Sequence, residues 1–161
     1  MKKEKIVPVQ EPYYGTARGL DVELNLPRES WMQDWPIEVI KAAHLPMLVE
    51  HYEKANEIDK KYVLMTAMLE AILMTPKIKA AEVLVYLEKI NQFLIDDYLI
   101  HEYHIYHWLK YRSENYEELP STNHLGKLSA DIKNIYESNN NRTPKENRRI
   151  EKEERLKEKK D

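Results

Sequence analysis

The order of hydrophobic and polar residues divides the chain into three parts. Between residues 31 and 138, hydrophobic residues recur every three to four positions, and prolines stand where the first turn of a helix tolerates them. Residues 1–30 show little helical periodicity, and residues 139–161 are almost entirely polar. We therefore expect an all-α protein: a compact bundle of five to six helices with an extended N-terminal arm and a charged C-terminal tail.

Helix boundaries in the central part follow from capping residues and prolines. The helices predicted in this way cover residues 36–44, 46–55, 60–74, 76–92, 97–112 and 125–136. The helix over 60–74 carries hydrophobic residues on more than half of its circumference, so it is expected at the centre of the bundle.

The arm contains one segment with a different period. Residues 20–26 alternate apolar and polar side chains without interruption, which predicts a strand with one buried face. No other segment has a comparable pattern, so this strand has two alternatives. It either packs across its own helical domain, which we favour, or offers Leu20, Val22 and Leu24 as an edge that pairs with another chain and forms a homo-oligomer.

Charge separates the body from the tail. The chain has 25 Lys and Arg against 28 Asp and Glu; residues 1–138 have a net charge of −6 and residues 139–161 of +3. Such a tail buries too little apolar surface to offset its ordering entropy, so it is expected to be disordered or a solvated helix. Because six acidic residues lie within the tail, binding of nucleic acid through it is the weaker hypothesis.

Composition excludes several classes of protein. The absence of Cys removes disulfides, thiolate nucleophiles and Cys-ligated metal centres, and three Gly cannot build a Walker-type or dinucleotide-binding loop. No apolar run approaches the roughly 20 residues of a membrane span, and no apolar stretch precedes Pro8 as in a cleaved secretory signal. We expect a cytoplasmic protein.

The densest chemical cluster lies in the predicted helix 97–112. Asp97, His101 and His104 fall on one helical stripe, and a carboxylate one turn before an imidazole can orient it. A metalloprotease helix needs His-Glu-x-x-His, whereas the spacing here is one residue too short. We therefore interpret the histidines as core or interface residues. A metal site of Asp97, His101 and His104 is the minority hypothesis, and no cofactor is predicted.

Aromatic residues indicate surfaces for a protein partner. The chain has 11 Tyr and a single Phe, and Tyr103, Tyr106 and His107 lie on the helix that carries the histidine cluster. Trp31 and Trp35, one helical turn apart, either anchor the arm to the bundle, which we favour, or belong to a partner surface. No Lys or Arg lies within residues 94–109, which is typical of a protein-binding face rather than a nucleic-acid-binding one.

These patterns favour a non-enzymatic protein that acts by binding another protein. No Gly-x-Ser-x-Gly motif or Cys supplies a nucleophile, and we predict no catalytic residues. The expected classes are a bacterial or phage accessory protein, an inhibitor, an immunity factor or an assembly chaperone, with a basic partner suited to the acidic body. A nucleic-acid-associated regulator that uses the tail and a His/carboxylate metalloprotein are the alternatives.

Overall fold

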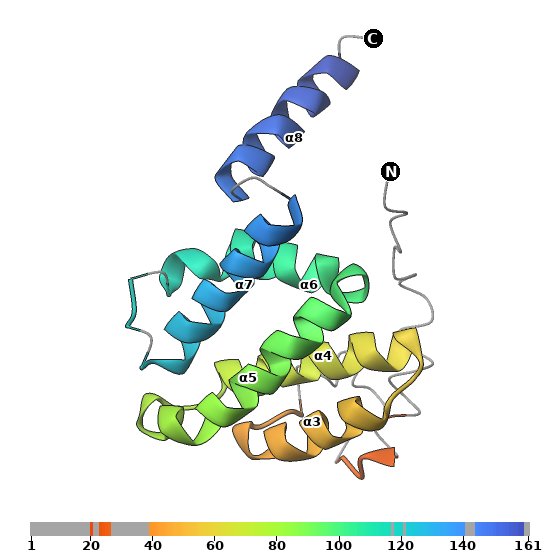
Figure 1. The fold of residues 1–161 in the computed structure, drawn as a ribbon, viewed down its shortest axis with the longest axis vertical. Helices are drawn as coiled ribbons and strands as arrows, with labels where there is room; N and C mark the ends of the chain where they lie inside the picture. Colours follow the sequence, from red (N-terminus) through yellow and green to blue (C-terminus); the bar gives the residue numbers. More distant parts are fainter. Residues whose placement is uncertain are drawn as a thin grey trace.

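The computed structural model describes residues 20, 23–26, 39–116, 118–120, 122–140 and 144–159, and within them the fold is a helical bundle (Figure 1). The elements are η1 (Ala42–His44), α3 (Leu45–Lys54), α4 (Ile58–Leu73), η2 (Lys77–Lys79), α5 (Ala80–Asp96), α6 (Tyr98–Tyr111), η3 (Ser113–Asn115), α7 (His124–Asn140) and α8 (Pro144–Glu158). The predicted all-α class is confirmed, and the described residues contain no strand.

The hydrophobic stripes of five helices meet in one core. As predicted, α4 is central: half of its 16 residues are buried, and it packs against α3, α6 and α7. α5 packs against α3, α6 and α7 and closes the other side of the bundle. The largest fully buried side chains are Leu20, Leu45, Leu48, Leu64, Met65, Met68, Ile72, Leu87, Ile90, Leu94 and Ile105.

Helix ends differ from the prediction where tertiary contacts outweigh local polarity. The helix predicted to end at Gln92 continues to Asp96, because Leu94 is drawn into the core. The break before α6 falls at Asp97 as expected, but the Asp97 side chain does not cap the helix. The helix predicted over residues 36–44 is wrong in its described part, since Val39 to Lys41 are not helical and only Ala42–His44 forms a short turn.

The strand predicted over residues 20–26 is also wrong in its described residues. Leu20 and Glu23 are helical, the Leu24 amide donates to the Leu20 carbonyl at 2.8 Å, and Asn25 ends the turn with φ of 54°. Leu20 and Leu24 are buried in the core. Residues four apart share one face of a strand and also one face of a helix, so the Leu20–Leu24 pair fits both geometries, and packing on the bundle decides between them.

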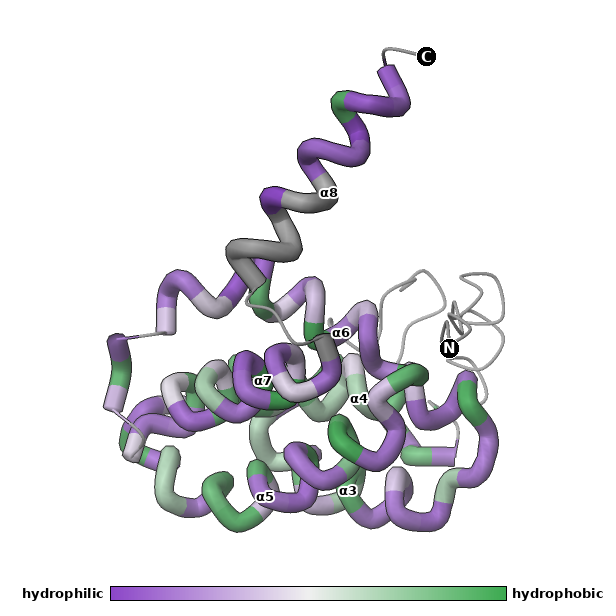
Figure 2. The backbone as a smooth tube through the Cα atoms, turned by 45° about the horizontal axis from the view of Figure 1, so that its top comes forward, coloured by the Kyte–Doolittle hydropathy of each residue, from purple (hydrophilic) through white to green (hydrophobic). Residues whose placement is uncertain are grey.

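α8 extends away from the bundle (Figure 2), and its described side chains, Arg149 and residues 152–158, are exposed. The part of the tail that the structure describes is helical, and its described side chains face solvent. Arg149 and Glu153 form an ion pair at 3.9 Å across one turn. Among the described residues, no helix combines the length and the apolar character that a membrane span requires.

Candidate functional site

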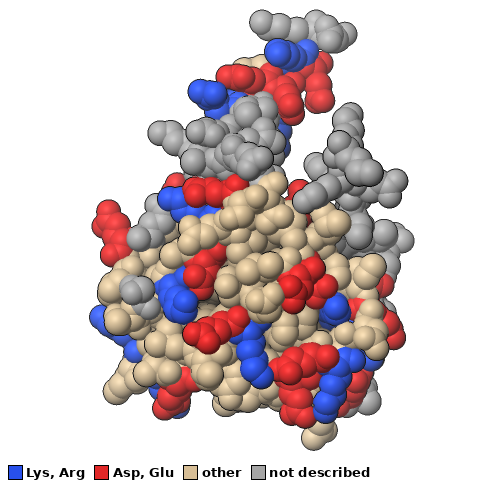
Figure 3. Space-filling view, in the orientation of Figure 1, with Lys and Arg blue, Asp and Glu red and all other residues tan. Residues whose placement is uncertain are grey.

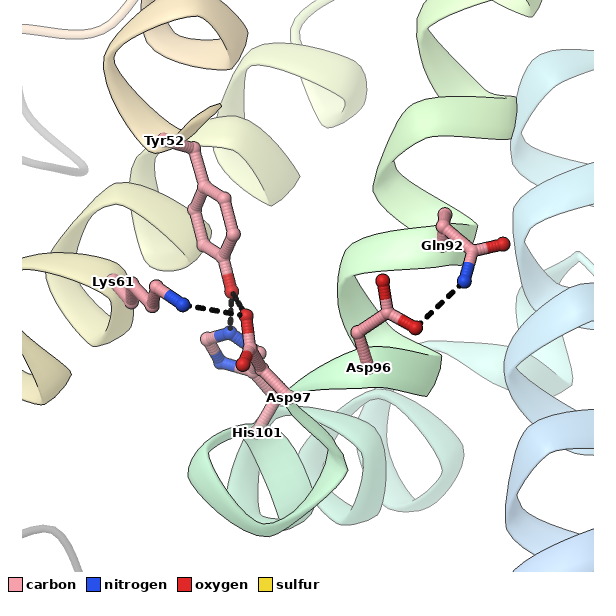
Figure 4. Close-up of polar contacts among 6 residues, drawn as sticks. All are labelled: Tyr52, Lys61, Gln92, Asp96, Asp97 and His101. Atoms are coloured by element: carbon pink, nitrogen blue, oxygen red, sulfur yellow. Dashed lines mark hydrogen bonds and ion pairs between the residues drawn. The ribbon is translucent and has the colours of Figure 1, made fainter. Parts of the chain in front are cut away.

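His101 on α6 faces α3, and polar side chains link it to Tyr52 of α3 and, through Asp97, to Lys61 of α4 (Figure 4). The Tyr52 hydroxyl, from α3, donates to Oδ2 of Asp97 at 2.7 Å and lies 2.7 Å from Nε2 of His101. Lys61, from α4, donates to the same Asp97 oxygen at 3.1 Å. The predicted Asp97–His101 contact is therefore indirect, because the Tyr52 hydroxyl stands between carboxylate and imidazole.

The polar contacts continue along α6 from His101 to His104, one turn further on. Nδ1 of His101 lies 3.2 Å from Nδ1 of His104, and Nε2 of His104 lies 2.8 Å from the Thr66 hydroxyl of α4. The His104 ring also packs on the Tyr62 ring, with centroids 4.3 Å apart. Six side chains from three segments thus form one continuous chain, which we call the buried relay: Lys61, Asp97, Tyr52, His101, His104 and Thr66.

Burial keeps the aromatic members of the relay uncharged. Desolvation, with a smaller contribution from the Lys61 charge, lowers the pKa of His101 to about 3. Desolvation also holds the pKa of His104 well below the ordinary histidine value. The pKa of Tyr52 is raised, first by burial and then by its hydrogen bond to Asp97. At neutral pH both imidazoles and the phenol are therefore neutral, and the ion pair of the relay, Lys61–Asp97, lies at one end of it.

The relay does not assemble the metal site of the minority hypothesis. His101 and His104 are adjacent as predicted, but Asp97 is directed to Tyr52 and Lys61. All four ring nitrogens of the two histidines have a hydrogen-bonding neighbour. Among the described residues, no group of three or more His, Asp or Glu side chains is placed to hold a metal ion, whereas a stable site needs three or four ligands.

Sequence reasoning missed three relay members: Tyr52, Lys61 and Thr66. Tyr52 was the one with a local signal, because a Tyr on an apolar helical stripe buries its ring and then needs a partner for its hydroxyl. Lys61 and Thr66 had no local signal, because their partners in the relay, Asp97 and His104, are 36 and 38 residues away in the sequence.

The outer side of α6 carries a row of three rings, two of them exposed and the middle one, His107, half-buried. Tyr103, His107 and Tyr111 lie one turn apart, with ring centroids 5.8 Å and 4.8 Å from one another. Tyr103 is 53% exposed and Tyr111 58%, and the Lys110 ammonium lies 5.2 Å from the Tyr111 ring centroid. We call Tyr103, His107 and Tyr111 the aromatic ridge. Tyr106 is half-buried beside it, with Lys110 5.8 Å from its ring centroid.

α4 runs beside the ridge in the same direction as α6. Its half-buried residues Tyr62, Thr66 and Glu70 are also one turn apart. Tyr62 contacts His104 at one end, and at the other the Arg112 charge opposes the rise that burial causes in the pKa of Glu70. The two helices therefore present a common face that is aromatic along most of its length and polar at its end.

The remaining predicted partner-binding residues divide into two groups. Leu20 and Leu24 are buried in the core, so neither offers a free strand edge to a second chain. Val22, Trp31 and Trp35 lie outside the described residues. Comparisons with known protein families, with curated proteins and with solved structures found no match for this chain.

Proposed function

We propose that this is a non-enzymatic protein that binds another protein through the face formed by α4 and the aromatic ridge of α6. One observation supports this most directly: Tyr103 and Tyr111, on one side of a helix, are 53% and 58% exposed. Tyrosine rings bury much area at small entropic cost and are enriched among residues that dominate binding energy. The classes to consider remain an accessory protein, an inhibitor, an immunity factor or an assembly chaperone.

The face suits a helical or extended segment lying along it. α4 and α6 supply two parallel rows of side chains one turn apart, which is the spacing that an amphipathic helix of a partner contacts with successive turns. The net charge of −6 over residues 1–138 would speed encounter with a basic partner. On the side where α5 and α7 lie in front, acidic and basic side chains alternate (Figure 3), so attraction there would come from net charge rather than from one patch.

The experiment compares the full-length chain with two double variants in affinity capture from the host. Tyr103→Ala with Tyr111→Ala removes the ridge rings, and Val85→Ala with Ile95→Ala, exposed positions on α5, is the matched control. The captured partner is then purified, and its affinity is measured by calorimetry. We expect equal affinity for the wild type and the control, and at least tenfold weaker binding for the ridge variant, about 1.4 kcal/mol.

Two results would reject this proposal. One is a stoichiometric partner that binds the ridge variant as tightly as the wild type, which would move the interface elsewhere. The other is the absence of any protein that the wild type retains and the ridge variant loses.

A further inference from the structure

The buried relay has a direction, because each of its hydrogen bonds needs one donor and one acceptor. An ionised carboxylate only accepts, so both Lys61 and Tyr52 donate to Asp97. Tyr52 has a single proton, and its oxygen must therefore accept from Nε2–H of His101 at 2.7 Å. This assigns the proton of neutral His101 to Nε2 and leaves its Nδ1 bare.

The donors keep the same direction as far as Thr66, at the other end of the relay. The bare Nδ1 of His101 accepts from Nδ1–H of His104, 3.2 Å away. Nε2 of neutral His104 is then bare and accepts from the Thr66 hydroxyl at 2.8 Å. Every donor in the relay thus points toward Asp97, and the Asp97 charge selects the tautomers of two histidines that it does not touch.

The opposite direction is also complete, because Thr66 has a second acceptor. Its hydroxyl lies 3.1 Å from the Tyr62 carbonyl oxygen. With Thr66 donating there, Nε2–H of His104 donates to Thr66, Nδ1–H of His101 donates to His104, and Tyr52 donates to His101. Both arrangements hold four protons on Tyr52, His101, His104 and Thr66, so they differ only in where each proton sits.

We propose that the buried relay is a two-state hydrogen-bond switch. Its protons point toward Asp97 while that carboxylate accepts from Tyr52, and they reverse together, exchanging the tautomers of His101 and His104, when this acceptor is lost. Lys61 and Asp97 each keep 21% of the side chain exposed, so groups outside the protein can reach this end. The other end lies under the Tyr62 and Tyr103 rings, which contact His104, so the switch joins an accessible ion pair to the α4–α6 face.

The test reads the protonation of each imidazole nitrogen by two-bond ¹H–¹⁵N NMR of the folded full-length chain at pH 7. In the wild type we expect the proton on Nε2 of His101 and on Nδ1 of His104. In Asp97→Ala both are expected to reverse, to Nδ1 of His101 and Nε2 of His104. Lys61→Met is the matched control: it removes the cation but keeps the accepting carboxylate, so the wild-type tautomers should persist.

A second variant keeps the test decisive if Asp97→Ala does not fold. Tyr52→Phe retains the ring but removes the acceptor for Nε2–H of His101, so the tautomers should reverse as in Asp97→Ala. The proposal is overturned if the wild type shows other tautomers. It is equally overturned if a folded Asp97→Ala or Tyr52→Phe chain keeps the wild-type pattern, or if Lys61→Met reverses it.

Discussion

The Tyr52 hydroxyl and Nε2 of His101 lie 2.7 Å apart, although the two residues are 49 positions apart in the chain. This contact ties α3 to α6 inside the bundle, and the Tyr52 ring at the same time stacks on Phe93 of α5 with centroids 4.2 Å apart. Tyr52 therefore links its own helix, α3, to two others: to α6 through the hydroxyl and to α5 through the ring.

Tyr52→Phe should destabilise the protein by about 1–3 kcal/mol, because it leaves a buried imidazole nitrogen without its partner while the ring contacts remain. Urea unfolding followed by circular dichroism measures the change. Tyr103→Phe is the control: it removes a hydroxyl from an exposed ring and should change stability by no more than about 0.5 kcal/mol. Equal stability of Tyr52→Phe and the wild type would mean that the hydroxyl contributes nothing.

Acid should destabilise the fold through the buried histidines. The unfolded chain protonates them below the ordinary value of 6.5, whereas the pKa of folded His101 is lowered to about 3. The unfolded state therefore binds more protons between these values, and stability is lost as pH falls through that window. His101 and His104 should each contribute a slope of up to about 1.4 kcal/mol per pH unit.

His101→Gln tests this acid effect, because it removes one of the two titrating groups. The free energy of unfolding, measured by urea titration at several pH values, should then fall less steeply below pH 6.5. Above pH 7.5 the slopes of variant and wild type should agree. An unchanged slope below pH 6.5 would show that His101 is not the group responsible.

Gly126→Ala should destabilise α7 where it meets the preceding loop. An added Cβ would lie 2.8 Å from the carbonyl oxygens of Leu119 and Pro120, and because these atoms are backbone the loop or the helix must shift. We expect a loss above about 1 kcal/mol, measured as a lower melting temperature. Asn134→Ala, an exposed position further along α7, should be neutral or slightly stabilising; a neutral Gly126→Ala would contradict the close approach.

Ser129→Ala should cost about 1–3 kcal/mol, because the buried Trp108 Nε1–H donates to the Ser129 hydroxyl at 3.0 Å and would lose its acceptor. Denaturant unfolding checks this against Ser138→Ala, the same change at an exposed position of α7. If the two variants are equally stable, the α6–α7 hydrogen bond is not a source of stability.

Zinc should not stabilise the protein, because the ring nitrogens of His101 and His104 are engaged with each other, with Tyr52 and with Thr66. We expect no shift in melting temperature when one equivalent of Zn²⁺ is added to protein dialysed against chelator. His101→Ala with His104→Ala should lower stability without changing metal content. A zinc-dependent rise that this double variant abolishes would restore the metal hypothesis.

The histidine cluster shows which contacts helical spacing can predict and which it cannot. The 3.6-residue period placed His101 and His104 on one inward-facing stripe of a helix, and both are buried there. It also suggested that Asp97 would touch His101 directly. Tyr52 and Lys61 contact the Asp97 carboxylate instead, and Tyr52 also contacts His101. These partners are 36 to 49 residues away in the chain, and helical spacing cannot predict contacts at such separations.

The sequence by itself determined the helical class, the central position of α4 and the break before α6, since these follow from periodicity and from interruptions that act over a few residues. Only the tertiary structure decided that Leu20 and Leu24 lie on a helical turn rather than a strand, and that the six members of the relay meet. The first was undecided because a pair of residues at i and i+4 fits either a strand or a helix. The second was undecided because burial of apolar area and pairing of buried polar groups depend on contacts between helices, which local sequence spacing does not predict.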